Sequence, residues 1–332
     1  MLFGAQIRQA GGLLAALRRA EAMGAEVMQV FPQSPRQWRY PEANAERSLA
    51  FGRAWPASGV VRRVVCHAPY LINLGAADAE VYARSCACLA ENLRAAGAMG
   101  AAGLIVHLGS HLGAGLESRL GAIAAGLRAA LDRSDCPLLL ENTAGAGGTI
   151  GRSFEELARV IAGAGDDPRL GVCLDTQHAW AAGMAFGTVD AADAVVGELD
   201  RTVGLERLAC LHVNDSKVAH GAGVDRHDNP GRGHMGPAPF RALLGHPALQ
   251  GLPAVLEVPG TDNGGPDAHE LAVIRRLHAE GLALRARAAP GTGRGSPSTA
   301  APAPHVGASR STSPRPSRSR GDRDSVRSQR RS

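Results

Sequence analysis

Short apolar segments recur along the first 260 residues, and stretches with helical spacing separate them. Most of these segments are uninterrupted rather than alternating, which is typical of strands buried on both faces of a parallel sheet. The intervening stretches, such as residues 11–24 and 80–100, are rich in Ala, Leu and Arg and finish at a Gly, a common helix cap. Eight strands are predicted, at residues 2–6, 26–31, 63–68, 103–108, 137–142, 170–175, 208–213 and 253–258.

Strands that alternate with helices eight times in fewer than 290 residues favour a (β/α)8 TIM barrel, an α/β fold. A doubly wound open sheet is the alternative, but no GxGxxG phosphate loop directly follows a predicted strand. We therefore predict one barrel domain over residues 1–285. In such barrels the active site is built from the loops at the carboxyl ends of the strands.

The composition changes sharply after residue 285. The remaining residues include ten Arg, no Lys and two Asp, and are rich in Pro, Ser and Gly. We predict that residues 286–332 form a disordered tail, either a solvated appendage or a segment that attracts polyanions nonspecifically. Residues 1–285 hold 26 basic and 29 acidic residues, so the tail accounts for the net charge of +5 of the whole chain.

Six cysteines occur, and Cys66, Cys173 and Cys210 lie inside apolar segments, where a free thiol acts as a small core residue. Cys86 and Cys88 lie in a predicted helix at a spacing unlike the CxxC of zinc or redox sites. Six free cysteines suit a reducing compartment best. No signal peptide and no apolar span of membrane length is visible. We therefore expect a cytoplasmic protein that does not enter a membrane.

Ionisable residues stand where six of the predicted strands end, and three more follow nearby. Burying such a group costs about 2–7 kcal/mol or more unless it is paired, hydrogen-bonded or bound to metal. Because the pattern repeats at six strand ends, we expect these residues to belong to one functional site. The nine candidate metal ligands are His67, His107, Glu141, Asp175, His178, His212, Asp225, His227 and Glu257.

Mixed imidazole and carboxylate ligation without thiolate suits Zn²⁺, Mn²⁺ or Fe²⁺ better than Ca²⁺ or Mg²⁺. Nine ligands exceed the needs of one tetrahedral ion, so two or three ions are expected, with a Glu able to bridge a pair. Asp225 and His227 lie two residues apart and would face the same side of an extended segment. Adjacent metal ions suit in-line displacement at phosphorus, so hydrolysis of a phosphoester is the leading chemistry.

The segments that carry these residues resemble the endonuclease IV family of apurinic/apyrimidinic endonucleases, which are barrels of the xylose isomerase type. The resemblance extends over residues 3–280. LHVNDSK followed by DRH is its most specific part, and HAPYLINL is nearly as specific. The matching segments include PRQW at 35–38, HAPYLINLG at 67–75, HLGSH at 107–111, ENTAG at 141–145, GVCLDTQHAWAAG at 171–183, LHVNDSK at 211–217, DRH at 225–227 and LEVPG at 256–260.

The resemblance implies three zinc ions. The first would be held by His67, His107 and Glu141. The second would share Glu141 and take Asp175, His212 and Glu257, and the third would take His178, Asp225 and His227. It further implies a monomer that cuts duplex DNA 5′ to abasic sites in base excision repair, leaving a 3′-hydroxyl and a 5′-deoxyribose phosphate, with possible trimming of 3′ ends. Attack by an activated water near Glu141 is expected.

Residues matching those that enter the duplex in this family are Arg36, Tyr70 and Leu71. Tyr70 and Leu71 could equally pack their loop, and Arg36 could be a solvated charge. His111, Arg226 and His234 are candidates for orienting ligands or binding phosphate, and His111 and His234 could instead make ordinary loop hydrogen bonds.

The chain departs from the family pattern at four positions, which puts metal affinity and rate in question more than the type of reaction: Leu108 replaces Pro, Gln177 replaces Cys, Arg232 replaces Glu and Val258 replaces Thr. Two other functions stay open. A sugar isomerase or epimerase of the same barrel type would need only the subset Glu141, Asp175, His212 and Glu257. A nucleic-acid-binding protein with a purely structural metal cluster is the second alternative.

Overall fold

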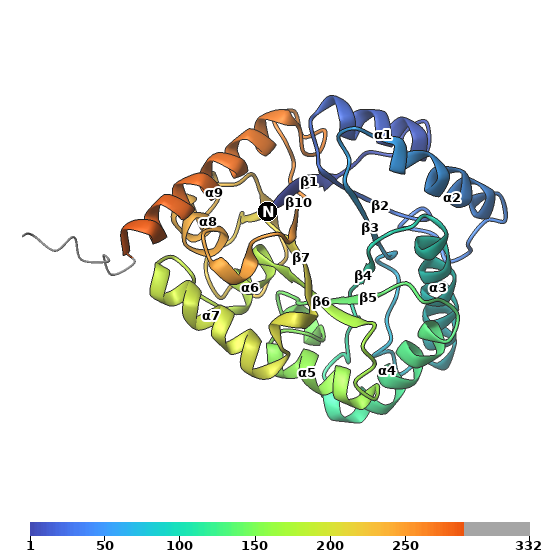
Figure 1. Ribbon diagram of the computed structural model, residues 1–332. Helices are drawn as coiled ribbons and strands as arrows, with labels where there is room; N and C mark the ends of the chain where they lie inside the picture. The colour runs from blue at the N-terminus through green and yellow to red at the C-terminus, as the bar shows by residue number, and fades with distance from the viewer. Residues whose placement is uncertain (289–332) are drawn as a thin grey trace, which may run out of the picture. The chain divides into compact units, whose positions relative to one another are not determined.

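A closed barrel of eight parallel strands forms the centre of the computed structural model, which describes residues 1–288 (Figure 1). The strands are β1 (Leu2–Gln6), β2 (Val27–Val30), β3 (Arg63–His67), β4 (Leu104–Val106), β5 (Leu138–Glu141), β6 (Leu170–Asp175), β7 (Leu208–His212) and β10 (Pro253–Leu256). Strand β1 pairs in parallel with both β2 and β10, which closes the cylinder. The prediction of a TIM barrel is confirmed, and the doubly wound alternative is wrong.

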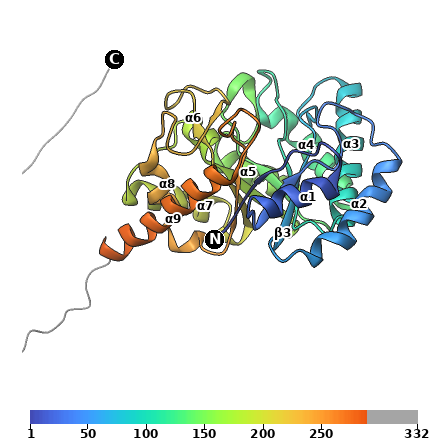
Figure 2. The same cartoon turned by 90° about the horizontal axis from the view of Figure 1, so that it is seen from above.

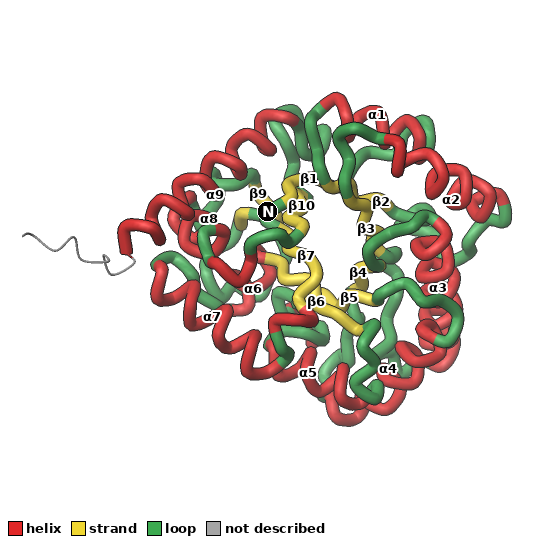
Figure 3. Tube along the Cα trace, viewed as in Figure 1, coloured by secondary structure: helices red, strands yellow, loops and turns green. Residues whose placement is uncertain are grey.

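Eight helices surround the barrel, one after each strand (Figures 2 and 3). They are α1 (Leu13–Ala22), α2 (Ala43–Ala54), α3 (Ala79–Ala98), α4 (Leu116–Leu131), α5 (Phe154–Gly163), α7 (Val189–Thr202), α8 (Pro237–Leu244) and α9 (Ala268–Ala288). Side-chain caps fix where several of them begin: Asp78 accepts from two backbone amides of α3, Ser153 from one of α5 and Thr188 from one of α7.

Additional short elements decorate the loops on the carboxyl side of β6 and β7. Helix α6 (Thr176–Ala182) follows β6 directly. The two-residue strands β8 (Asp215–Ser216) and β9 (His227–Asp228) pair antiparallel within the loop after β7. Among the described residues, no helix is long and apolar enough to cross a membrane. The predicted tail, residues 286–332, lies outside the described residues apart from its first three, which continue α9.

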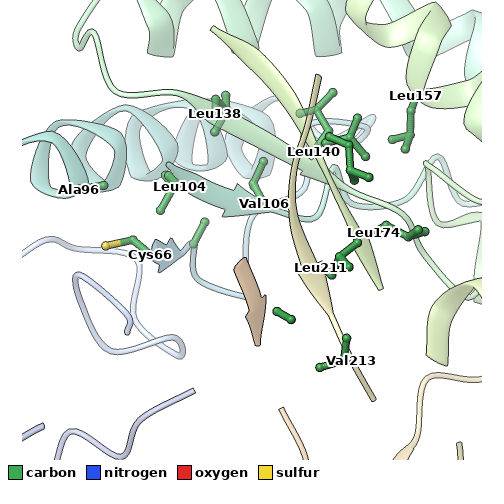
Figure 4. Close-up of a cluster of buried hydrophobic side chains, with 14 of the residues drawn as sticks. Cys66, Ala96, Leu104, Val106, Leu138, Leu140, Leu157, Leu174, Leu211 and Val213 are labelled. Atoms are coloured by element: carbon green, nitrogen blue, oxygen red, sulfur yellow. The ribbon is translucent and has the colours of Figure 1, made fainter. Parts of the chain in front are cut away.

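The larger part of the core lies between the barrel and its helices, where apolar side chains of both pack together (Figure 4). Leu138 and Leu140 of β5 are fully buried there, as is Leu157 of α5. All six cysteines are free, and all but the half-buried Cys86 are buried. Burial of these uninterrupted apolar segments on both faces explains why they lack a two-residue alternation.

The inside of the barrel is built in two layers. The lower layer is apolar and takes one residue from each of seven strands: Val27, Val65, Ile105, Leu139, Cys173, Cys210 and Val255. Side chains two positions apart in a strand point to the same side. The residues two positions further along the chain are all polar or ionisable: Gln29, His67, His107, Glu141, Asp175, His212 and Glu257. An apolar floor therefore lies beneath a polar layer at the carboxyl end.

Candidate metal centre

A cavity of about 640 Å³ opens at the carboxyl ends of the strands, above the polar layer. Residues that line it include His67, His107, His178, His227 and Glu257. The polar layer contributes six of the nine predicted ligands. The structure brings the other three, His178, Asp225 and His227, to the same place from the loops after β6 and β7.

The first group of candidate ligands comes from the ends of β3 and β5 and from the residue directly after β4. Nε2 of His67 lies 3.1 Å from Oε2 of Glu141, and Nε2 of His107 lies 3.2 Å from the same oxygen. One ligand atom from each of the three residues lies within 4.8 Å of the other two. These are the residues that the family resemblance assigns to one ion.

The second group shares Glu141 through its other oxygen. Nδ1 of His212 lies 2.8 Å from Oε1 of Glu141 and 3.2 Å from Oε2 of Glu257. Asp175 completes this group, with Oδ2 at 3.8 Å from the same nitrogen. Because Glu141 presents one oxygen to each group, its carboxylate has the position expected of a bridge.

The third group combines helix α6 with strand β9. Nε2 of His178 lies 3.3 Å from Oδ2 of Asp225, and Nε2 of His227 lies 3.2 Å from Oδ1 of the same carboxylate. Asp175 also joins His178 and His227 within 4.8 Å. Asp175 therefore stands between the second and third groups, a position that the spacing in the sequence does not reveal.

Four of the five imidazoles use one ring nitrogen in a hydrogen bond to a backbone carbonyl or a side-chain amide oxygen rather than to a carboxylate. Nδ1 of His67, His178 and His227 donates to the backbone carbonyl oxygens of Ala68, Asn142 and Glu257, at 2.7, 2.9 and 2.9 Å. Nε2 of His212 lies 2.9 Å from the side-chain oxygen of Gln29. These bonds fix the tautomer, so the remaining nitrogen of each neutral ring presents a lone pair to the centre.

The close approach of imidazole nitrogens to carboxylate oxygens shows whether these residues suit a metal ion. Lone pairs of imidazole nitrogens face carboxylate oxygens at about 3 Å, which is repulsive unless a proton or a cation lies between them. Nε2 of His227 is buried and has no hydrogen-bond partner. Imidazole with carboxylate is the donor set that borderline divalent metals prefer. The residues therefore fit a metal centre.

The ionisation of Glu141 supports the same conclusion. Burial opposes the charged form of this fully buried carboxylate, but attraction to His107 and His212 outweighs it and holds the pKa of Glu141 well below its ordinary value. Burial likewise opposes protonation of His178 and His212, yet the surrounding carboxylates raise the pKa of both rings well above the ordinary value. The centre therefore holds concentrated negative charge that attracts cations.

Two residues that the sequence analysis missed hold the ligands in place. Gln29, fully buried, donates through Nε2 to Oε1 of Glu257 at 2.5 Å and to Gln6 at 3.0 Å, so its own oxygen is the acceptor for His212. Asn214 donates to Oδ2 of Asp175 at 2.6 Å and accepts from the backbone amide of Glu257 at 2.8 Å. A polar residue inside the apolar segment 26–31 was the available signal for Gln29.

The predicted DNA-contacting residues lie on loops beside the cavity. Tyr70 is 61% exposed and lines the cavity, with its ring edge-on to Phe31 at 5.4 Å between centroids. Leu71 is half-buried and Arg36 is exposed. Tyr70 thus packs against Phe31 and also leaves most of its side chain exposed, and its contact with DNA stays a prediction.

The remaining polar candidates are placed differently. Nδ1 of His111 accepts from the backbone amides of Gly113 and Gly115, both at 3.2 Å, so this ring organises its own loop. Arg226 is exposed and donates to the carbonyl oxygen of its neighbour Asp225. His234 is exposed, and its backbone amide donates to Ser216. A role of these residues in binding phosphate stays a prediction.

The four departures from the family pattern have clear structural positions. Leu108 is buried in the core, and Val258 lines the cavity. Gln177 is buried and donates to Oγ of Ser216 at 3.2 Å and to the carbonyl oxygen of Val224 at 3.0 Å, which fixes the segment next to Asp225. Arg232 is exposed and lies 3.2 Å from Nε2 of His269 rather than among the candidate ligands.

Comparison with known proteins now identifies the family. The profile described as xylose isomerase-like TIM barrel matches residues 14–277. A protein of Methanoculleus marisnigri named probable endonuclease 4 is 39% identical over 280 residues, which cover 83% of this chain and 99% of that protein.

Solved structures agree. The crystal structure of endonuclease IV from Thermus thermophilus superimposes with a TM-score of 0.68 at 34% identity, covering 86% of this chain and 100% of that one. A D-tagatose 3-epimerase-like protein has a TM-score of 0.62 over 87% of this chain and 100% of its own, but its 17% identity shows a shared fold alone. The chain belongs to the endonuclease IV family of xylose isomerase-like TIM barrels.

Proposed function

We propose that this chain is a metal-dependent apurinic/apyrimidinic endonuclease that hydrolyses the phosphodiester 5′ to abasic sites in duplex DNA. The products would be a 3′-hydroxyl and a 5′-deoxyribose phosphate. The observation that supports this most directly is the convergence of five imidazoles and four carboxylates at the mouth of one barrel, in a chain whose relatives are named endonuclease 4. Some trimming of damaged 3′ ends is part of the same proposal.

Three zinc ions are the expected cofactors, with Mn²⁺ or Fe²⁺ able to replace some of them. They would be held by the three groups described above, with Glu141 shared between two of them. When bound, such ions activate water and neutralise the charge that develops on a phosphate under attack. The buried hydrogen bonds of Gln29, Asn214 and the backbone carbonyls hold the ligands ready for them.

The polypeptide itself would position the DNA. An abasic nucleotide has lost its pairing and much of its stacking, so extruding it from the helix costs least at the lesion. Arg36, Tyr70 and Leu71 lie on the loops after β2 and β3 and are proposed to occupy the space that the extruded nucleotide leaves. The cavity of about 640 Å³ above the polar layer would accept the extruded sugar and its phosphates.

The charge of the barrel is consistent with this proposal only if cations are bound. Residues 1–285 carry slightly more acidic than basic side chains, and four of the acidic ones lie in the proposed site. Divalent ions are often the largest local charges in a site and can reverse the local field. Exposed Arg36, Arg226 and Arg232 would add positive charge.

A sugar isomerase or epimerase is the alternative of the same barrel type. The group Glu141, Asp175, His212 and Glu257 would suffice for that chemistry. Isomerase or epimerase chemistry would assign no role to the other five candidate ligands. The structure nevertheless holds all five around the same cavity: His67, His107, His178, Asp225 and His227. These additional residues favour the nuclease.

Incubation with a labelled duplex that carries one tetrahydrofuran abasic analogue tests the proposal. The native protein should incise 5′ to the analogue, and chelator treatment or Glu141→Gln should reduce the rate at least about 10²–10³-fold, the order for losing one group that stabilises a transition state. The analogue cannot undergo β-elimination, so a lyase would leave it intact. Turnover of ketoses with no incision would favour the epimerase instead, and metal-independent binding without turnover would favour a binding protein.

A further inference from the structure

Large apolar side chains that are exposed fall into two classes in the described part of the chain. Four of them, Leu14, Leu49, Leu282 and Leu284, lie in the outer helices. The other three lie in loops that follow barrel strands, on the side of the cavity: Tyr70, Leu112 and Val224. Leu112 is the most exposed of all seven, at 79%.

Leu112 also has an unfavourable backbone conformation. Its φ of 48° lies in the left-handed region, which the described residues other than Gly adopt only here and at Asp166 and Asn263. Asp and Asn tolerate this conformation because their short polar side chains can hydrogen-bond locally, whereas Leu has no such compensation for the close approach of its Cβ to the following carbonyl oxygen. Leu at this position therefore carries a conformational cost, and its 79% exposed side chain gains little burial energy in the folded chain to offset that cost.

The loop that presents Leu112 is held firmly on both sides. Oγ of Ser110 accepts from the backbone amide of Leu112 at 3.0 Å and donates to Gly147 of the next loop at 2.6 Å. The amide of Ser110 donates to Asn73, on the loop that carries Tyr70, at 2.9 Å. His111 adds its two hydrogen bonds to Gly113 and Gly115. Three adjacent loops are thus joined, and the exposed side chain extends from a fixed base.

We propose that Leu112 is a further contact with the duplex, an apolar tip that packs against sugars or base edges beside the lesion. The inference rests on the proposed endonuclease function. Duplex DNA is the occupant that the structure favours, because the loop of Leu112 is hydrogen-bonded directly to the loop of Tyr70, and Tyr70 lines the cavity. Proteins that bend DNA use apolar side chains in this way.

Leu112→Asn tests this inference, because Asn removes the apolar surface and suits the left-handed backbone. The metal-loaded variant should melt at the same temperature as the native protein or higher. Its KM for the tetrahydrofuran duplex should rise about tenfold, as expected when burial of most of a Leu side chain is lost. The kcat should change less than about twofold, because uniform binding is lost rather than stabilisation of the transition state.

Two control variants distinguish a contact with DNA from a general effect of the substitution. Leu112→Met retains the apolar tip and should keep KM near the native value. Leu284→Asn removes a side chain that is 41% exposed at the far end of α9 and should leave KM unchanged. Since Leu carries no charge, the dependence of kcat/KM on salt should have the same slope in Leu112→Asn as in the native protein, unlike the loss of a phosphate contact.

An unchanged KM in Leu112→Asn, or an equal rise in Leu284→Asn, would overturn the inference while leaving the endonuclease intact. A native dimer in sedimentation that Leu112→Asn dissociates would also overturn it, since the side chain would then contact a second copy. Failure of the native protein to incise the duplex would instead remove the proposed function on which the inference depends.

Discussion

At the scale of single residues, the placement of one proton decides which imidazole nitrogen is free to bind a cation. His212 illustrates this, because the amide of Gln29 accepts from Nε2 and leaves Nδ1 to face Glu141 and Glu257. The same amide donates to Glu257. Gln29 thereby orients two candidate ligands at once, although it is not itself expected to touch a metal.

Replacing Gln29 by Leu should weaken the second metal group selectively. The change leaves Nε2 of His212 without its acceptor and Glu257 without its donor, so zinc affinity at one site should fall about 10–100-fold. Competition with a chromophoric zinc chelator measures this affinity.

Gln33→Leu provides the matched control. Gln33 is also buried and hydrogen-bonded, to the backbone of Gln37 and to Asn92, but lies outside the candidate metal groups. Both changes should lower stability by about 1–3 kcal/mol for the unsatisfied partners left behind. Equal zinc affinities in the two variants would contradict the positioning role of Gln29.

At the scale of elements, each of seven strands supplies the polar residue two positions after its residue in the apolar layer. The segment after β7 follows no such rule and needs separate support. Asp225 and His227 belong to this segment, and the β8–β9 pair and Asp215 organise it. Asp215 accepts from the backbone amides of Gly231 and Met235 at 2.8 and 3.0 Å. Helix α6 adds a further connection through Gln177, next to the ligand candidate His178.

Gln177→Ala should therefore reduce metal retention at the third group alone. The variant loses the hydrogen bond to the carbonyl oxygen of Val224, which immediately precedes Asp225, so this segment should become mobile. After dialysis, elemental analysis should find about one fewer zinc per chain than in the native protein, as expected when a support of the ligands is lost.

Gln250→Ala is the control for this change. Gln250 also donates through its amide to two oxygens, the backbone carbonyls of Leu244 and His246, but near the amino end of β10. Both variants should lose about 1 kcal/mol of stability per hydrogen bond. Full zinc content in Gln177→Ala would show that the connection from α6 does not hold the third group.

At the scale of the whole molecule, the barrel could be predicted because every central strand is an apolar run too short for a helix. Segment ends were less exact: residues 26 and 31 lie outside β2, and residues 107 and 108 lie beyond β4. The last residue of a strand depends on hydrogen bonds to its neighbours, which a local pattern does not contain.

The site could be predicted where an ionisable residue ends an apolar run, because burial of such a group is costly without a partner. Gln29 escaped this rule because it is uncharged and lies within its run. The position of Asp175 beside His178 and His227 of the third group was not predicted either, because it depends on where α6 places His178. Distances between side chains on different strands follow from closure of the barrel, not from spacing along the chain.

Closure of the barrel also brings the ionisable groups of the site together. Their effect on the stability of the protein should become measurable when the metal is removed. Although burial opposes it, nearby carboxylates raise the pKa of His67, His178 and His212 above their ordinary 6.5. In metal-free protein, their stabilising contribution is therefore complete below pH 6.5 and lost as the pH rises through the raised values. The pKa of Glu141 is lowered from 4.5, so its contribution is present above pH 4.5 and lost as the pH falls through the lowered value.

Chelation should consequently destabilise the protein much more at about pH 8 than at about pH 6, because protons can replace the metal only at the lower value. Thermal unfolding with and without chelator at both values measures this difference, and added zinc should restore the native melting temperature at pH 8. The contribution of these four groups to the stability of the metal-free protein should be largest between about pH 4.5 and 6.5. An equal loss at both pH values would mean that the imidazoles and carboxylates of the barrel do not exchange protons for cations.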